Sequence, residues 1–235
     1  MAEIPEKFVE NRIEELKESE NVRAAAVVGS YAREPSSKHN DLDIFVIVED
    51  DHFWRETEDI QSIVVEYFYN PLEKAVEWLD GDDWWYNYHW YTNADVRYDP
   101  DNLFDRLQEK AEEVKQDRLD LSEDDKQEIA YSIWDRKQDF DTDDVAQKRY
   151  LMNNFFSYLL QKFYLLEGEV PVKSNYRIEA LNGINGYIYK LSQDFLLSSS
   201  TSEKERIIEK MIDYISKDLP EISPEWSSEK QESQA

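Results

Sequence analysis

A Gly-Ser pair between two short apolar runs is the feature that most constrains the fold of this 235-residue chain. Residues 23–28 (RAAAVV) and 41–48 (DLDIFVIV) have the length and composition of buried strands. Gly29-Ser30 comes directly after the first run and predicts a tight turn into the start of a helix. We therefore expect a strand, a turn with a helix start, and then a second strand.

Two aspartates stand at the start of the second run. Side chains alternate between the faces of a strand, so Asp41 and Asp43 share one face, about 7 Å apart at a rise of roughly 3.3 Å per residue. Carboxylates suit Mg²⁺, whose shell is usually completed by substrate phosphates. The Gly29-Ser30 turn offers backbone N–H groups and a hydroxyl to a triphosphate. This pattern favours Mg²⁺-dependent phosphoryl chemistry.

The run Val28-Gly29-Ser30, ten residues, and then Asp41-Leu42-Asp43-Ile44 resembles the signature of the DNA polymerase β-like nucleotidyltransferase superfamily. The resemblance covers roughly residues 23–70. It implies that Gly29 and Ser30 hold the nucleotide phosphates, and that Asp41 and Asp43 bind Mg²⁺. It also implies a third carboxylate on the next strand, and Glu66 is the one charged residue of the apolar run 62–69.

The chain departs from this family at two loop positions. Small members often read Gly-Ser-x-Ala-Arg-Gly and Ser-Asp-x-Asp, whereas here Glu34 follows Arg33 and Asn40 precedes Asp41. Neither change removes a metal ligand, so the departures concern the shape of the loop. The three histidines lack metal-site spacing and are expected to be structural; among them, His39 lies close to this loop.

The net charge of the chain limits which molecules it can bind. Lys and Arg total 27 against 53 Asp and Glu, giving a net charge of −26 and a pI near 4.4. So acidic a surface repels nucleic-acid phosphates, which argues against a polymerase. The acidity fits either adaptation to high intracellular salt, as in a halophilic protein, or attraction of a cationic substrate, and both can hold.

Other features of composition concern the compartment. The absence of cysteine excludes disulfides and Cys-based zinc sites. No run approaches 18 apolar residues, and the acidic amphipathic start is unlike a signal peptide. We expect a soluble cytoplasmic protein with no membrane partner.

The remaining pattern predicts an α+β fold: a nucleotidyltransferase domain over residues 1–101, with a small mixed sheet flanked by helices, and an all-α bundle over 102–219. Residues 220–235 read as a polar tail. Helices are expected at about 5–18, 72–79, 103–114, 122–133, 143–167, 187–195 and 202–219, and a closing strand at 96–100. The stretch 50–59 reads as a polar connection with room for a short helix. The aromatic run 84–91 fits either an interface between sheet and helices or a stacking platform for a ligand.

The order of domains is similar to that of antibiotic adenylyltransferases, in which a C-terminal helical domain closes the cleft. That resemblance implies an enzyme that transfers NMP, most simply AMP from ATP, to an acceptor hydroxyl of a small molecule with release of pyrophosphate. Arg33 and Lys173 are candidate phosphate contacts. Glu66 either completes the metal site or acts as general base. A protein-modifying, antitoxin-like adenylyltransferase and a non-catalytic nucleotide-binding module remain as alternatives.

Overall fold

The computed structural model describes residues 3–81, 83–221, 224 and 227, and divides the chain into two compact units, Met1–Gln116 and Asp117–Ala235. The division falls inside helix α5 (Leu103–Leu119), not near residue 101 as the sequence suggested. The first turns of α5 pack on the sheet, with the Phe104 ring 6.1 Å from that of Phe45. This packing places the start of the helix in the first unit.

Within the described residues, the first unit holds a five-stranded mixed sheet in the order β3-β4-β2-β1-β5. Strands β2 and β4 are parallel and the other neighbours are antiparallel. The strands are β1 (Val22–Val28), β2 (Asp41–Val48), β3 (Trp54–Ile60), β4 (Ile63–Pro71) and β5 (Asp95–Tyr98). The mixed sheet flanked by helices confirms the predicted fold class, and the strands expected from the four apolar runs are all present.

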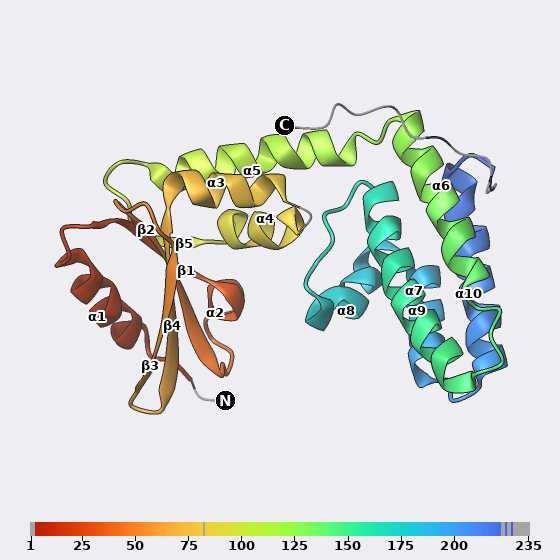
Figure 1. Ribbon diagram of the computed structural model, residues 1–235. Coiled ribbons are helices and arrows are strands. Elements are labelled where there is room, and N and C mark those ends of the chain that lie inside the picture. Colours follow the sequence, from red (N-terminus) through yellow and green to blue (C-terminus); the bar gives the residue numbers. More distant parts are fainter. Residues whose placement is uncertain (1–2, 82, 222–223, 225–226, 228–235) are drawn as a thin grey trace. The chain divides into compact units, whose positions relative to one another are not determined.

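Helices cover the two faces of the sheet differently (Figure 1). Helix α1 (Glu6–Lys17) packs its apolar side chains against one face, where they meet Ile44 and Val46 of β2. On the opposite face Phe45 contacts the rings of Tyr91 and Phe104, from α4 (Trp84–Thr92) and α5. Because Asp41 and Asp43 alternate with the α1-facing residues, they share the face of Phe45.

Strand β3 corrects the expectation of a polar connection at 50–59. It pairs antiparallel with β4 through a hairpin whose two turn residues, Gln61 and Ser62, have positive φ values of 57° and 66°. Such values at both central positions are typical of the hairpin turn that matches strand twist. Most of β3 is exposed because it lies at the edge of the sheet, so its sequence (WRETEDI) needs no apolar alternation.

The aromatic run forms α4, and its rings pack into the first unit. Trp90 lies 4.7 Å from Phe68 and 6.2 Å from Phe45 between ring centroids, and the Tyr91 hydroxyl donates to the Ala75 carbonyl of α3 (Leu72–Asp80). Burial of Trp84, Tyr88, Trp90 and Tyr91 agrees with the interface reading of this run. These rings join the sheet to α3 and α5.

The second unit is helical, as predicted. Its helices are α6 (Glu123–Gln138), α7 (Val145–Leu166), α8 (Ser174–Ile184), α9 (Gly186–Leu197) and α10 (Thr201–Ile215), followed by the short η1 (Ser216–Asp218). The capping box of Ser122 and Asp125 opens α6. Helix α8 was not expected, because Leu181 is its one fully buried residue among those described and gives no apolar stripe. Most of the 220–235 tail lies outside the described residues.

No helix in the described part of the chain combines the length and the apolar character needed to cross a membrane.

The excess of acidic side chains leads to a prediction about salt. With a net charge of −26 the folded state repels itself. Potassium chloride shortens the Debye length from about 10 Å at 0.1 M to about 3 Å at 1 M, so the melting temperature should rise over this range. Differential scanning calorimetry across a KCl series measures it. A constant melting temperature would contradict a halophilic protein and favour a role of the acidity in recognising a cationic acceptor.

Candidate active site

The two β2 aspartates lie at the centre of the sheet. Asp43 is opposite Val28 of β1 and opposite Glu66 of β4, so the strand register places it between the Gly29 turn and the third predicted carboxylate. Asp41 and Asp43 are both partly buried. Because parallel partners in register present their side chains on the same face, Glu66 shares the face of both aspartates.

Gly29 is required at its position for two reasons. Its φ is +72°, in the left-handed region that favours glycine. A Cβ atom there would also stand 2.1 Å from Oδ2 of Asp43, far inside van der Waals contact. The structure thus brings the predicted phosphate-binding turn directly against a predicted metal-binding carboxylate. The turn opens α2 (Gly29–Arg33), with Ser30 as its second residue.

The Ser30 side chain has a buried partner. Ser30 Oγ lies 3.1 Å from Nδ1 of His39, and Nε2 of His39 lies 2.8 Å from the carbonyl oxygen of Glu34. The imidazole also meets the Tyr31 ring edge-on, with centroids 5.3 Å apart. The sequence placed His39 near the carboxylate loop but gave no sign of this contact, since the eight intervening positions hold the rest of α2 and a loop.

Glu66 is engaged by a residue from the edge strand. Arg55 Nη2 lies 2.5 Å from Glu66 Oε2, and the Arg55 guanidinium lies 4.8 Å from the centroid of the Phe68 ring. Sequence reasoning missed Arg55 because β3 was read as a connection. The available signal was that Arg55 is the single Lys or Arg between residues 49 and 60 in an otherwise acidic stretch.

The carboxylates of Asp41, Asp43 and Glu66 are the candidates for holding a metal ion. Among the residues that the structure describes, no three His, Asp or Glu side chains lie close enough together to hold a metal ion. The ion pair with Arg55 holds the carboxylate of Glu66. The donor set itself suits Mg²⁺, because carboxylate oxygens are hard ligands and one or two of them, with substrate phosphates, are a usual complement. The carboxylates of Asp41 and Asp43 are therefore chemically suited to hold Mg²⁺ together with substrate phosphates.

The two predicted basic contacts lie in different units. Arg33 is exposed at the last position of α2, close in sequence to the turn. Lys173 occupies the N-cap position of α8 in the second unit. Their contacts with phosphate stay predictions.

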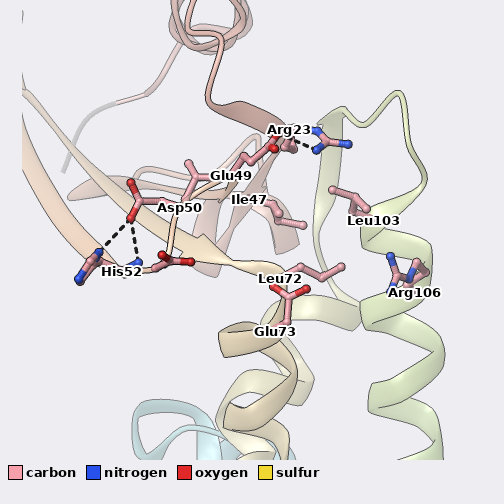
Figure 2. A pocket seen from close by; sticks show the side chains of 11 residues that line it. Arg23, Ile47, Glu49, Asp50, His52, Leu72, Glu73, Leu103 and Arg106 are labelled. Atoms are coloured by element: carbon pink, nitrogen blue, oxygen red, sulfur yellow. Dashed lines mark hydrogen bonds and ion pairs between the residues drawn. The ribbon is translucent and has the colours of Figure 1, made fainter.

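A separate open pocket of about 710 Å³ lies at the other end of β2 (Figure 2). Arg23 forms ion pairs there with Glu49 at 3.0 Å and Asp101 at 2.5 Å. Hydrogen bonds from His52 lower the pKa of Asp50. No predicted site residue lines this pocket; its lining is Arg23, Ile47, Val48, Glu49, Asp50, Asp51, His52, Leu72, Glu73, Leu103 and Arg106. Its charged groups include several that already pair with one another.

Comparisons with known proteins bear on the fold and on the segment that holds the β2 site. Residues 10–74 match the family described as Polymerase beta, Nucleotidyltransferase, a span that contains β1 to β4. A solved structure of a nucleotidyltransferase-like protein from Exiguobacterium sibiricum is similar, with 13% identity and a TM-score of 0.51 over 89% of this chain and 73% of that one. At this identity the likeness shows the fold. No curated protein matches. The segment that carries Gly29, Asp43 and Glu66 therefore matches the polymerase β-like nucleotidyltransferase family, and the fold of the chain is that of a nucleotidyltransferase-like protein.

Proposed function

We propose that this protein is a Mg²⁺-dependent nucleotidyltransferase that moves NMP, most simply AMP from ATP, to an acceptor hydroxyl of a small molecule. The observation that carries the proposal is the close approach of the Gly29 turn to Asp43, with Glu66 in register on the neighbouring strand. This arrangement supports a site in which groups for phosphate, for a cation and for a proton share one face of the sheet. General nucleotidyl transfer follows from the family, whereas the donor and the acceptor are our proposal.

Each residue has a distinct task in this scheme. Asp41 and Asp43 would hold Mg²⁺, which when bound neutralises charge on the phosphates. The backbone N–H groups of the turn at Gly29 and Ser30 hold phosphate oxygens, which can only accept hydrogen bonds. Arg33, at the end of α2, would add positive charge to the triphosphate, and a contact of Lys173 with phosphate stays a prediction from the sequence. The net effect is to fix the α-phosphate for in-line attack.

Glu66 serves the acceptor side of the reaction. As general base, its carboxylate takes the proton as the acceptor O–H bond breaks. The acceptor oxygen forms a bond to the α-phosphorus, and the bond from that phosphorus to pyrophosphate breaks. Arg55 holds Glu66 in place beside Asp43. In the other role, Glu66 leaves Arg55 to become a third metal ligand.

The proposal is tested by following a labelled phosphate. Each of the four ribonucleotides carrying ³²P at the α-position is incubated with the protein, MgCl₂ and a metabolite extract. We expect the label of one nucleotide, ATP, to move to a small molecule while pyrophosphate appears. Label on protein would instead favour the antitoxin-like alternative. The incubation is repeated with an extract that also contains protein and RNA. If the protein binds nucleotide but releases no pyrophosphate in either extract, it is a non-catalytic binding module.

Glu66→Gln should lower kcat by about a hundredfold or more while nucleotide affinity changes little, because general bases typically contribute factors of 10² to 10⁴. Glutamine keeps the shape of the side chain and its place in β4 but cannot take the proton. Steady-state kinetics with varied nucleotide measures both parameters. A kcat within twofold of the wild-type value would contradict a catalytic role for Glu66.

Arg55→Met separates the two roles of Glu66. Methionine keeps apolar packing on Phe68 and removes the ion pair. If Glu66 is the base, the Mg²⁺ concentration for half-maximal rate stays constant. If Glu66 is a metal ligand, that concentration falls in Arg55→Met, because a competing cation has been removed. Lys74→Met, at an exposed local ion pair on α3, is the matched control.

A further inference from the structure

His39 is a buried polar residue that the scheme above leaves without a task. It lies on the loop between α2 and β2 and is 6% exposed. One ring nitrogen meets the Ser30 hydroxyl at 3.1 Å, and the other meets the Glu34 carbonyl at 2.8 Å. The ring thus ties the start of the loop to its end, two residues before Asp41, and holds the side chain of the turn as well.

The contact with Glu34 has a fixed direction. A carbonyl oxygen can only accept, so Nε2 carries the proton and donates to Glu34. The hydrogen bond between Nδ1 and Ser30 Oγ orients the Ser30 hydroxyl whichever of the two atoms is the donor. Because a hydroxyl can make more than one hydrogen bond, Oγ keeps the capacity for a contact with a ligand.

We propose that His39 is a positioning residue for nucleotide binding, which acts by orienting the Ser30 hydroxyl beside the phosphate-binding turn. This inference rests on the proposed function, since it assigns a task within the same site. Under it, the backbone N–H groups of the turn bind phosphate oxygens, and the Ser30 hydroxyl, held by His39, adds one further contact with the nucleotide. The alternative is that His39 only packs the loop.

Four variants separate these two roles. His39→Phe keeps a ring beside Tyr31 and removes both hydrogen bonds, and His39→Asn keeps a side-chain oxygen that can accept from Ser30. Ser30→Ala and the double variant His39→Phe/Ser30→Ala complete a cycle. Calorimetry with ATP and Mg²⁺ gives the Kd of each, and kinetics gives kcat. His52→Phe, at an imidazole whose side chain is 87% exposed, is the control.

We expect His39→Phe to raise the Kd about tenfold, as the loss of one to two buried hydrogen bonds does, with a smaller change in kcat. The same substitution should have little effect when Ser30 is already alanine, and His39→Asn should recover most of the affinity. Equal losses with and without the Ser30 hydroxyl would overturn the proposal, because His39 would then act on the loop alone.

A spectroscopic measurement keeps the inference testable if His39→Phe does not fold. The ¹⁵N shifts of the imidazole in the free wild-type protein report the tautomer, and we expect the proton on Nε2. A proton on Nδ1 alone would overturn the proposal without reference to activity. Wild-type protein that binds no nucleotide would contradict the proposed function itself, whereas an additive cycle in protein that binds nucleotide would contradict only the role of His39.

Discussion

Asp43→Asn should lower nucleotidyl transfer about a thousandfold while the domain stays folded. Metal-ion stabilisation of phosphoryl transfer amounts to several kcal/mol, and about 4 kcal/mol corresponds to a factor near 10³. Asn has the shape of Asp but lacks its negative charge. Asp43 lies between the Gly29 turn and Glu66 in the strand register, so the loss of its charge falls at the centre of the proposed site. Asp41→Asn should have a similar effect.

Stability distinguishes this loss from unfolding. Removing one of several carboxylates that share a face relieves like-charge repulsion, so the melting temperature should stay constant or rise. Asp51→Asn, on the exposed segment after β2, is the control and should keep full activity. Transfer is measured as kcat/KM and stability by calorimetry. Near wild-type transfer in both aspartate variants would reject the metal site assigned here.

Gly29→Ala should abolish most of the activity and also destabilise the domain. The left-handed conformation costs a residue with a Cβ about 1–2 kcal/mol. The added Cβ would also lie 2.1 Å from Oδ2 of Asp43, so the carboxylate would have to move. We expect transfer to fall at least a hundredfold, because the carboxylate leaves its place beside the turn. Urea denaturation and kinetics measure the two effects.

Two further variants isolate the close approach. In an Asp43→Ala background the carboxylate is absent. Gly29→Ala should then lower the free energy of unfolding only by the cost of the left-handed backbone conformation. Gly183→Ala, in α8 with no heavy atom within 4 Å of the added Cβ, should be neutral or slightly stabilising. If Gly29→Ala destabilises the protein equally with and without the Asp43 carboxylate, the contact between them is not what selects glycine.

Much of the fold could be predicted from the sequence because its signals are local. The runs 23–28 and 41–48 are mostly apolar, and they form β1 and β2 almost residue for residue. Ser122 and Asp125 predicted the start of α6 through a capping box spanning four residues. In contrast, β3 is an exposed edge strand whose pairing partner, β4, determines its structure, so its own sequence shows little.

The candidate site was predictable to the same degree. Gly29, Asp41 and Asp43 follow from spacing along one strand–turn–strand segment. The contacts of Arg55 with Glu66 and of Ser30 with His39 depend on strand register and on the path of a loop, and neither can be read from residue order. The sequence also gave no reason for Gly29 beyond the turn, since the Asp43 carboxylate meets it only across paired strands.

Nucleotide-dependent binding of Mn²⁺, a paramagnetic substitute for Mg²⁺, tests whether Asp41 and Asp43 hold the cation. The free Mn²⁺ signal in electron paramagnetic resonance is titrated with protein in the presence of a non-hydrolysable ATP analogue, for wild type, Asp43→Asn and the control Asp51→Asn. We expect the free Mn²⁺ signal to fall in the presence of the analogue for wild type and Asp51→Asn, and to stay unchanged for Asp43→Asn. Equal binding in all three proteins would show that the cation is held by the acidic surface in general and would contradict a site at Asp41 and Asp43.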